Sequence, residues 1–252
     1  MVRPAPRLFT SERLGKGSLA LGQEHARYLG QVLRLGPGSD IRVFNGRDGE
    51  WLYRIARIDR RGGDALPVEQ TRLQAEATGL PVLLFAPLKR GPTEIVIQKA
   101  TELGAAVLQP VVTARTSRDN LRLDRLGTIA VEAAEQCERL TIPEIREPAP
   151  LGDALEAHKS FVFCDEAGNQ PSAPWGGEEG RAGLADHVFG PVESPPSAVL
   201  IGPEGGFTPD ERSALREDRR ALPISLGPRI LRAETAAIVA LTLWQTRFGD
   251  FS

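Results

Sequence analysis

The hydrophobic pattern of the first 75 residues predicts short strands separated by turns. Apolar and polar positions alternate over Asp40–Phe44 and again over Trp51–Ile55, and Asn45-Gly46 between them is a strong turn signal. Apolar residues within His25–Leu35 recur at helical spacing, which predicts one amphipathic helix before these strands. The pattern therefore indicates a small β-barrel closed by a helix.

From Leu80 the pattern changes to apolar runs that alternate with amphipathic segments. This alternation is typical of an α/β layer with a parallel sheet. Buried strands are expected over residues 82–86, 107–112, 161–164, 198–201 and 222–226. Helices are expected from the turn that holds Pro92 to Gly104, from about Asp124 to Arg139, and from Ala233 to about Arg247. Asp165–Ser197 carries six Gly and five Pro and is expected to be a long loop.

Charge is distributed unevenly along the 252 residues. The net charge of −2 argues, taken alone, against a nucleic-acid-binding protein. Up to Ala75, however, 13 Lys and Arg residues face 8 Asp and Glu, a net charge of +5, and the remaining 18 basic residues face 25 acidic ones, a net charge of −7. Only four of the cations are lysines, and the arginine fork suits phosphate. A GC-rich genome or a heat-adapted host is nevertheless the favoured explanation of the arginine excess.

Other classes of protein are disfavoured by what the sequence lacks. Cys137 and Cys164 are the only cysteines, which favours reduced, buried thiols over a disulfide, and no metal-ligand spacing occurs. The residues after Met1 do not resemble a signal peptide, and no run of about 18 apolar residues is present. We expect a soluble, cytoplasmic protein.

The most informative segment is Leu200–Glu211, where a predicted strand runs into glycines and then into a helix. Thr208, Pro209 and Glu211 supply an N-cap, a first-turn proline and a capping-box acid in the correct order. Ligands bind at the carboxyl ends of strands in open α/β sheets. The segment lacks the lysine and hydroxyl of a P-loop and the spacing of a dinucleotide fingerprint, so it predicts a ligand loop of another kind.

Ser225–Ala236 also passes from a strand into a helix and can form one pocket with the first loop. Arg232 and Glu234 lie where the ligand crevice of the sheet is expected, although an interaction within the helix is the alternative for this pair.

Four stretches together resemble the ribosomal RNA small-subunit methyltransferase E family, of the SPOUT class of knotted methyltransferases. They are Gly202–Phe207, Leu226–Ala236, Ile97–Gly104 and Glu132–Arg139, and His25, Val32–Leu35 and Gly38 fit its N-terminal domain. The resemblance implies a PUA-like RNA-binding β-barrel over residues 1–73 and a SPOUT α/β methyltransferase domain with a C-terminal trefoil knot over residues 74–252. It also implies a homodimer that methylates N3 of one uridine in 16S rRNA with S-adenosylmethionine. By this likeness the cofactor pocket is lined by Gly202, Gly206, Leu226, Gly227, Ile230, Leu231 and Arg232.

The reaction suggests roles for particular side chains. Uridine N3 must lose a proton, which calls for a base or for a cation that stabilises the developing anion. We expect Arg232 to stabilise the anion and Glu234 or Glu204 to act as base or orienting group. The expected RNA-binding residues are Arg7, Arg27, Arg34, Arg54 and Arg139, although Arg139 has pairing with Glu135 as an equal alternative.

Two other functions remain open from the sequence. A knotted methyltransferase for another RNA position would carry similar loops. A non-enzymatic RNA-binding assembly factor with the same fold would not bind S-adenosylmethionine.

Overall fold

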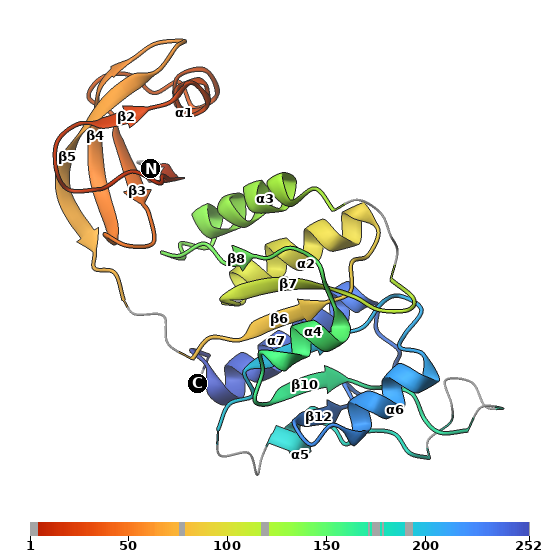
Figure 1. The fold of residues 1–252 in the computed structure, drawn as a ribbon. Coiled ribbons are helices and arrows are strands. Elements are labelled where there is room, and N and C mark those ends of the chain that lie inside the picture. Colours follow the sequence, from red (N-terminus) through yellow and green to blue (C-terminus); the bar gives the residue numbers. More distant parts are fainter. Residues whose placement is uncertain are drawn as a thin grey trace. The chain divides into compact units, whose positions relative to one another are not determined.

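The computed structural model describes residues 5–75, 79–116, 121–170, 172, 177, 179–189 and 194–251. The chain divides into two compact units, of which the first comprises residues 1–76 and 134–142 and the second comprises residues 77–133 and 143–252 (Figure 1). Our prediction divided the chain once, after residue 73. The structure adds residues 134–142 to the first unit, because they fold against its strands.

The first unit is a five-stranded sheet with the strand order β1-β3-β4-β5-β2. Leu8, Ile41, Tyr53 and Ile55 are among the buried residues of its core, so the predicted alternation places apolar side chains on one face. Its strands are β1 (Arg7–Phe9), β2 (Leu19–Leu21), β3 (Asp40–Phe44), β4 (Glu50–Ile58) and β5 (Gly63–Arg72).

The predicted helix over His25–Leu35 is present in two parts. The helix α1 (Gln23–Arg27) continues into a π-helical turn over Tyr28–Val32. Leu29 is fully buried, and the positive φ of 58° at Arg34 ends the helical segment.

The second unit is built on a parallel sheet with the order β12-β10-β11-β6-β7-β8, and β9 pairs with β7. Figure 1 labels β12, β10, β6, β7 and β8 of this sheet. Every residue of β10 and β11 is buried, as expected for strands covered on both faces. The strands are β6 (Val82–Phe85), β7 (Val107–Val112), β8 (Glu144–Ile145), β9 (Ala149–Pro150), β10 (Phe161–Cys164), β11 (Ala198–Ile201) and β12 (Ala221–Ile224).

Helices alternate with these strands, which confirms the predicted α/β class. They are α2 (Arg90–Glu102), α3 (Leu123–Gln136), α4 (Leu151–Glu156), α5 (Ala185–Phe189), α6 (Pro209–Glu217) and α7 (Ala233–Phe248). Helix α5 lies inside the predicted loop Asp165–Ser197, so that prediction is wrong for those residues. Ala185 and Phe189 are one helical turn apart and both buried, which accounts for the helix.

Helix α3 ends three residues earlier than its apolar spacing predicted. Glu138 adopts a positive φ of 62°, which terminates the helix after Gln136. Cys137 is exposed in this turn, so our expectation of two buried thiols is correct only for Cys164. Both cysteines are free, and burial raises the pKa of the Cys164 thiol.

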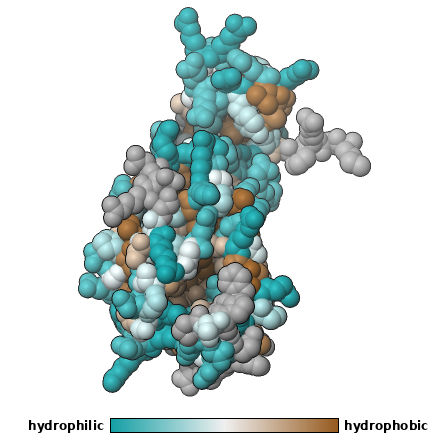
Figure 2. All heavy atoms as spheres, turned by 90° about the vertical axis from the view of Figure 1, so that its right-hand side faces the viewer, coloured by the Kyte–Doolittle hydropathy of each residue, from teal (hydrophilic) through white to brown (hydrophobic). Residues whose placement is uncertain are grey.

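Hydrophilic side chains cover most of the face that Figure 2 shows. Within the described residues, no helix is long and apolar enough to span a membrane. Nor do three His, Cys, Asp or Glu side chains of the described ranges gather closely enough to hold a metal ion.

Candidate active site

The strand order brings the two predicted ligand loops to one edge of the sheet. Because β10 pairs in parallel with both β11 and β12, residues 202–208 and residues 225–232 leave the sheet in the same direction. The segment after β10 starts between them. This edge is the place where open α/β sheets bind their ligands.

The loop after β11 is tight and open to a ligand. A Cβ atom at Gly202 would lie 2.9 Å from the Phe207 ring, so the close approach of this ring requires glycine. Gly206 has a φ of 67°, which also favours glycine, and its Cβ direction faces no atom within 4 Å. No hydrogen bond in the described part of the chain uses the N–H groups of Glu204 or Gly205, so both can serve a ligand.

The loop after β12 has the same open character. Gly227 has a φ of 109° and an unobstructed Cβ direction. Ser225 braces the loop through its Oγ atom, which lies 3.3 Å from Gly227 N. Leu226 and Leu231 are half-buried and Ile230 is 38% exposed, and their N–H groups donate to no group among the described residues.

Arg232, Glu204 and Glu234, the residues expected to carry the chemistry, lie at this edge. Arg232 is exposed and occupies the N-cap position of α7, where its side chain makes no capping hydrogen bond. Glu234 is half-buried in the first turn of α7, and Glu204 is exposed in the glycine-rich loop. Within the described residues no ion pair joins Arg232 to Glu234, so the helix does not use this pair for its own stability.

The predicted loop Asp165–Ser197 also starts at this edge, and sequence reasoning assigned no site residue to it. The Asp165 carboxylate is buried and accepts hydrogen bonds from Arg212 Nε at 2.7 Å and from Arg216 Nε at 2.6 Å. Arg212 also donates to the carbonyl oxygens of Ala167 and Gly168, which fixes the start of the loop. Burial raises the pKa of the neighbouring Glu166. The only signal in the sequence was the position of these residues directly after a buried strand.

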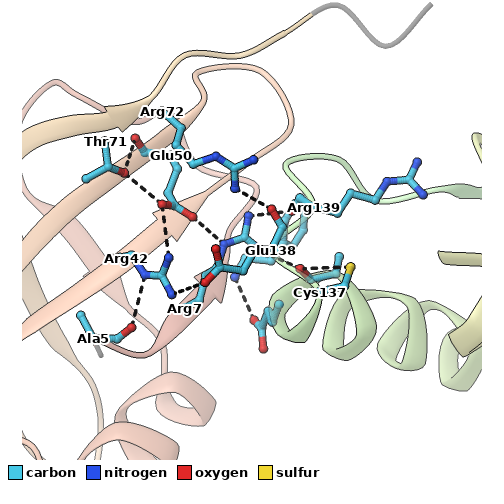
Figure 3. A network of polar contacts seen from close by, with 12 residues as sticks. Ala5, Arg7, Arg42, Glu50, Thr71, Arg72, Cys137, Glu138 and Arg139 are labelled. Carbon is cyan, nitrogen blue, oxygen red and sulfur yellow. Dashed lines mark hydrogen bonds and ion pairs between the residues drawn. The ribbon is translucent and has the colours of Figure 1, made fainter. Parts of the chain in front are cut away.

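Arg7 of the first unit is part of a buried network. Its residue is 6% exposed, and Nε lies 2.5 Å from the Glu50 carboxylate (Figure 3). Its other nitrogens donate to the carbonyl oxygens of Ala134 at 2.5 Å and Arg139 at 2.6 Å, so Arg7 holds the end of α3. Its burial and these three hydrogen bonds argue against the predicted role of Arg7 as an RNA contact.

Two further arginines complete this network (Figure 3). Arg42 Nη2 donates to Glu138 Oε1 at 2.8 Å, and Arg72 Nη1 donates to the Glu138 carbonyl oxygen at 2.6 Å. Hydrogen bonding to Arg42 holds the pKa of Glu138 below its ordinary range. Arg139 is half-buried and donates through Nε to Thr141 Oγ1 at 2.9 Å.

The remaining arginines of the predicted RNA-binding set are exposed. Arg27 and Arg34 make no ion pair within the described part of the chain. Arg54 is held by Asp40, which accepts from Nε at 2.8 Å and from Nη2 at 3.2 Å. Because Nη1 is left without a partner among the described residues, Arg54 retains donor capacity in a fixed orientation.

Two protein-family models match this chain. Residues 79–245 match the RNA methyltransferase domain, and residues 21–67 match the RNA methyltransferase PUA domain. The predicted PUA-like barrel and SPOUT-type α/β domain are thereby confirmed as the fold class.

Relatives that are similar along most of their length carry one name. The chain is 31% identical to ribosomal RNA small subunit methyltransferase E of Rickettsia conorii, covering 93% of both chains. It is 35% identical to the protein of the same name from Synechocystis, covering 91% of this chain and 73% of that protein.

Solved structures agree with this assignment. The Neisseria gonorrhoeae ribosomal RNA small subunit methyltransferase E, crystallised with S-adenosylmethionine, superposes with a TM-score of 0.81 at 26% identity, covering 99% of this chain and 100% of that chain. A Legionella pneumophila putative methyltransferase with bound cofactor superposes with a TM-score of 0.78 at 29% identity, covering 96% and 98% of the two chains. The chain therefore belongs to the ribosomal RNA small subunit methyltransferase E family of RNA methyltransferases.

Proposed function

We propose that this protein uses S-adenosylmethionine to methylate N3 of a specific uridine in the 16S rRNA of the small ribosomal subunit. The observation that carries the proposal is the meeting of two glycine-containing loops at one sheet edge. Several of their backbone N–H groups and the Arg232 side chain have no partner among the described residues. The names of its relatives and the cofactor bound by its Neisseria relative support the reaction and the methyl donor.

The two loops fit this cofactor. Gly206 and Gly227 leave space where a side chain would otherwise stand, and both loops offer N–H groups that no other group of the described chain uses. Such groups can hold the polar atoms of an adenosine and an amino acid without a charged side chain. The residues that would hold it are Gly202, Gly206, Leu226, Gly227, Ile230, Leu231 and Arg232.

The cofactor supplies an electrophilic methyl group, so the protein mainly has to align the acceptor atom and remove its proton. As N3 loses its proton, negative charge develops on the uracil oxygens. The Arg232 guanidinium is exposed and unpaired within the described chain and can stabilise this charge. Glu204 and Glu234 are the candidates for taking the proton or for orienting the base.

N3 lies on the Watson–Crick edge, so the target uridine has to be unpaired or flipped out of a helix. Flipping costs a few kcal/mol, which contacts elsewhere on the RNA must offset. We assign these contacts to the first unit, with Arg27, Arg34 and Arg54 as its leading phosphate contacts and Arg139 as a further candidate.

The proposal has three further properties. We infer a homodimer and a C-terminal trefoil knot, both of which the resemblance implies. A cytoplasmic location follows from a ribosomal substrate.

The decisive experiment is nucleoside mass spectrometry of 16S rRNA from a strain that lacks the gene. We expect 3-methyluridine to disappear and to return when the gene is restored. Unchanged 3-methyluridine together with loss of another methylated nucleoside would identify a different RNA position. Absence of S-adenosylmethionine binding in calorimetry, with all methylated nucleosides intact, would instead indicate a non-enzymatic assembly factor.

A further inference from the structure

The glycine-rich loop after β11 needs a restraint from outside itself. Gly202, Gly205 and Gly206 have large conformational freedom, and ordering them costs entropy. Within the loop, the backbone supplies one hydrogen bond, from Gly206 N–H to the Pro203 carbonyl oxygen at 2.8 Å. Residues 204–206 are exposed, so core packing does not hold them.

Arg115, which follows β7, provides that restraint. Its Nη1 atom donates to the Gly205 carbonyl oxygen at 2.7 Å and lies 3.5 Å from the Phe207 carbonyl oxygen. The Gly205 carbonyl and the Gly206 N–H belong to one planar peptide group. Arg115 therefore holds one side of this group while Pro203 holds the other, which sets the orientation of the whole peptide plane.

The turn that carries Arg115 is itself anchored. Thr113 N–H donates to Thr116 Oγ1 at 2.8 Å, which closes the turn. Ala114 N–H donates to Glu211 Oε1 at 2.7 Å, and the other oxygen of Glu211 accepts from Thr208 N–H at 2.8 Å. The turn is thus fastened to both the middle and the end of the glycine-rich loop.

The interactions of Arg115 are concentrated on the glycine-rich loop and on the cap that follows it. It is exposed and forms no ion pair within 4 Å in the described part of the chain. Its two hydrogen bonds both go to carbonyl oxygens of this loop, and its positive charge helps to lower the pKa of Glu211. An exposed charge interaction adds little to stability, so the two hydrogen bonds to the loop carbonyls are better explained by the geometry of the loop.

We propose that Arg115 is a positioning residue for the cofactor loop: it fixes the peptide between Gly205 and Gly206 so that the free N–H groups of Glu204 and Gly205 face the ligand in one arrangement. This inference rests on the proposed function, because it names the loop as part of the S-adenosylmethionine site.

The test compares Arg115→Ala with Arg115→Lys in the full-length protein. Calorimetric titration with S-adenosylmethionine is expected to show about tenfold weaker binding for Arg115→Ala, since one charge-assisted hydrogen bond that orders the loop is lost. Arg115→Lys should recover to within about threefold of the wild type, because an ammonium group can donate to the same carbonyl. Arg146→Ala is the matched control, since Arg146 is also outside the proposed site and pairs with Glu144.

Hydrogen exchange measured by mass spectrometry provides a second readout that does not need the cofactor. Exchange over residues 202–211 should be about tenfold faster in Arg115→Ala, while the thermal midpoint stays at that of the wild type. Wild-type affinity in Arg115→Ala, or unchanged exchange in this segment, would overturn the positioning role. Failure of the wild-type protein to bind S-adenosylmethionine would overturn the proposed function, and exchange would still decide whether Arg115 orders the loop.

Discussion

Helices α6 and α7 begin at the same edge of the sheet, yet their first turns are built differently. Helix α6 starts with a complete capping box, in which Thr208 Oγ1 accepts from Glu211 N–H and Glu211 accepts from Thr208 N–H, and Pro209 occupies the first turn. Helix α7 starts at Arg232, which makes no capping hydrogen bond and puts a positive charge at the positive end of the helix.

The start of α6 has a structural role, whereas the start of α7 has a chemical role in our proposal. The start of α6 satisfies its own backbone donors and is also tied to the turn after β7 through Ala114. The start of α7 forgoes a cap, which costs some stability, and keeps a cation exposed beside the loop of Gly227. A helix N-terminus usually has a capping side chain and no positive charge. Arg232 breaks both preferences at the position where the proposed reaction needs a positive charge.

The largest expected effect is the loss of methyl transfer in Arg232→Ala. Removing the group that stabilises the developing anion should lower kcat by about 100- to 1000-fold. Transfer of tritium from labelled S-adenosylmethionine to small ribosomal subunits measures the rate, and calorimetry should still detect cofactor binding.

Arg229→Ala serves as the control for this variant, since Arg229 is an exposed arginine of the same loop with no role in our proposal. Normal turnover in Arg232→Ala would remove Arg232 from the mechanism. Equal losses in the two variants would show that only the charge of the loop matters.

A smaller effect is expected at the start of α6. Thr208→Ala removes the cap and should lower the free energy of unfolding by about 1 kcal/mol. Urea unfolding followed by circular dichroism measures the change. Thr246→Ala lies in α7, where the exposed hydroxyl donates to the Thr242 carbonyl oxygen and to no other group among the described residues, and should have almost no effect. A similar loss of unfolding free energy in both variants would show that the cap contributes no more than an ordinary helical threonine.

The pH dependence of stability tests the contribution of the Glu211 carboxylate to the same cap. Burial alone would raise the pKa of Glu211, but hydrogen bonds from Ala114 and Thr208 outweigh it and hold the pKa below its ordinary value of 4.5. Because the folded-state pKa is depressed, the stabilisation is complete above pH 4.5 and is lost as the pH falls through the folded-state value.

The variant Glu211→Gln isolates this contribution. The stability difference between wild type and Glu211→Gln should stay constant from pH 7 to pH 5 and shrink below pH 4.5, by up to about 1 kcal/mol. Thermal unfolding at each pH measures it. A difference that does not change between pH 5 and pH 3 would show that the carboxylate is not what stabilises the cap.

Features fixed by neighbouring residues were predictable from the sequence. The capping box of α6 needs only Thr208, Pro209 and Glu211 in order, and the structure confirms it. The buried strands β6, β10 and β11 were also predicted correctly. A run of four apolar residues between two amphipathic segments is too short for a buried helix and is most easily placed as a buried strand.

Features that depend on distant residues were not predictable. Arg7 resembled a surface cation, but Glu50 and the carbonyl of Ala134 bury it from far along the chain. Arg115 and the Asp165 loop join the site only because β7 and β10 have particular places in the strand order. Counting charged residues along the sequence gives the net charge of a region. Whether each arginine is free to bind a ligand depends on its partners from distant parts of the chain.

The smallest expected change in stability, in Arg232→Ser, tests the comparison most directly. Serine would add the missing cap and remove a cation from the positive end of α7, so the free energy of unfolding should rise by about 0.5 kcal/mol. Methyl transfer should be lost as in Arg232→Ala, which lacks the cap and should gain less stability. Chemical denaturation and the tritium assay on the same preparations separate the two properties. A less stable Arg232→Ser would mean that the arginine stabilises α7, and the contrast between the two helix starts would then be one of stability alone.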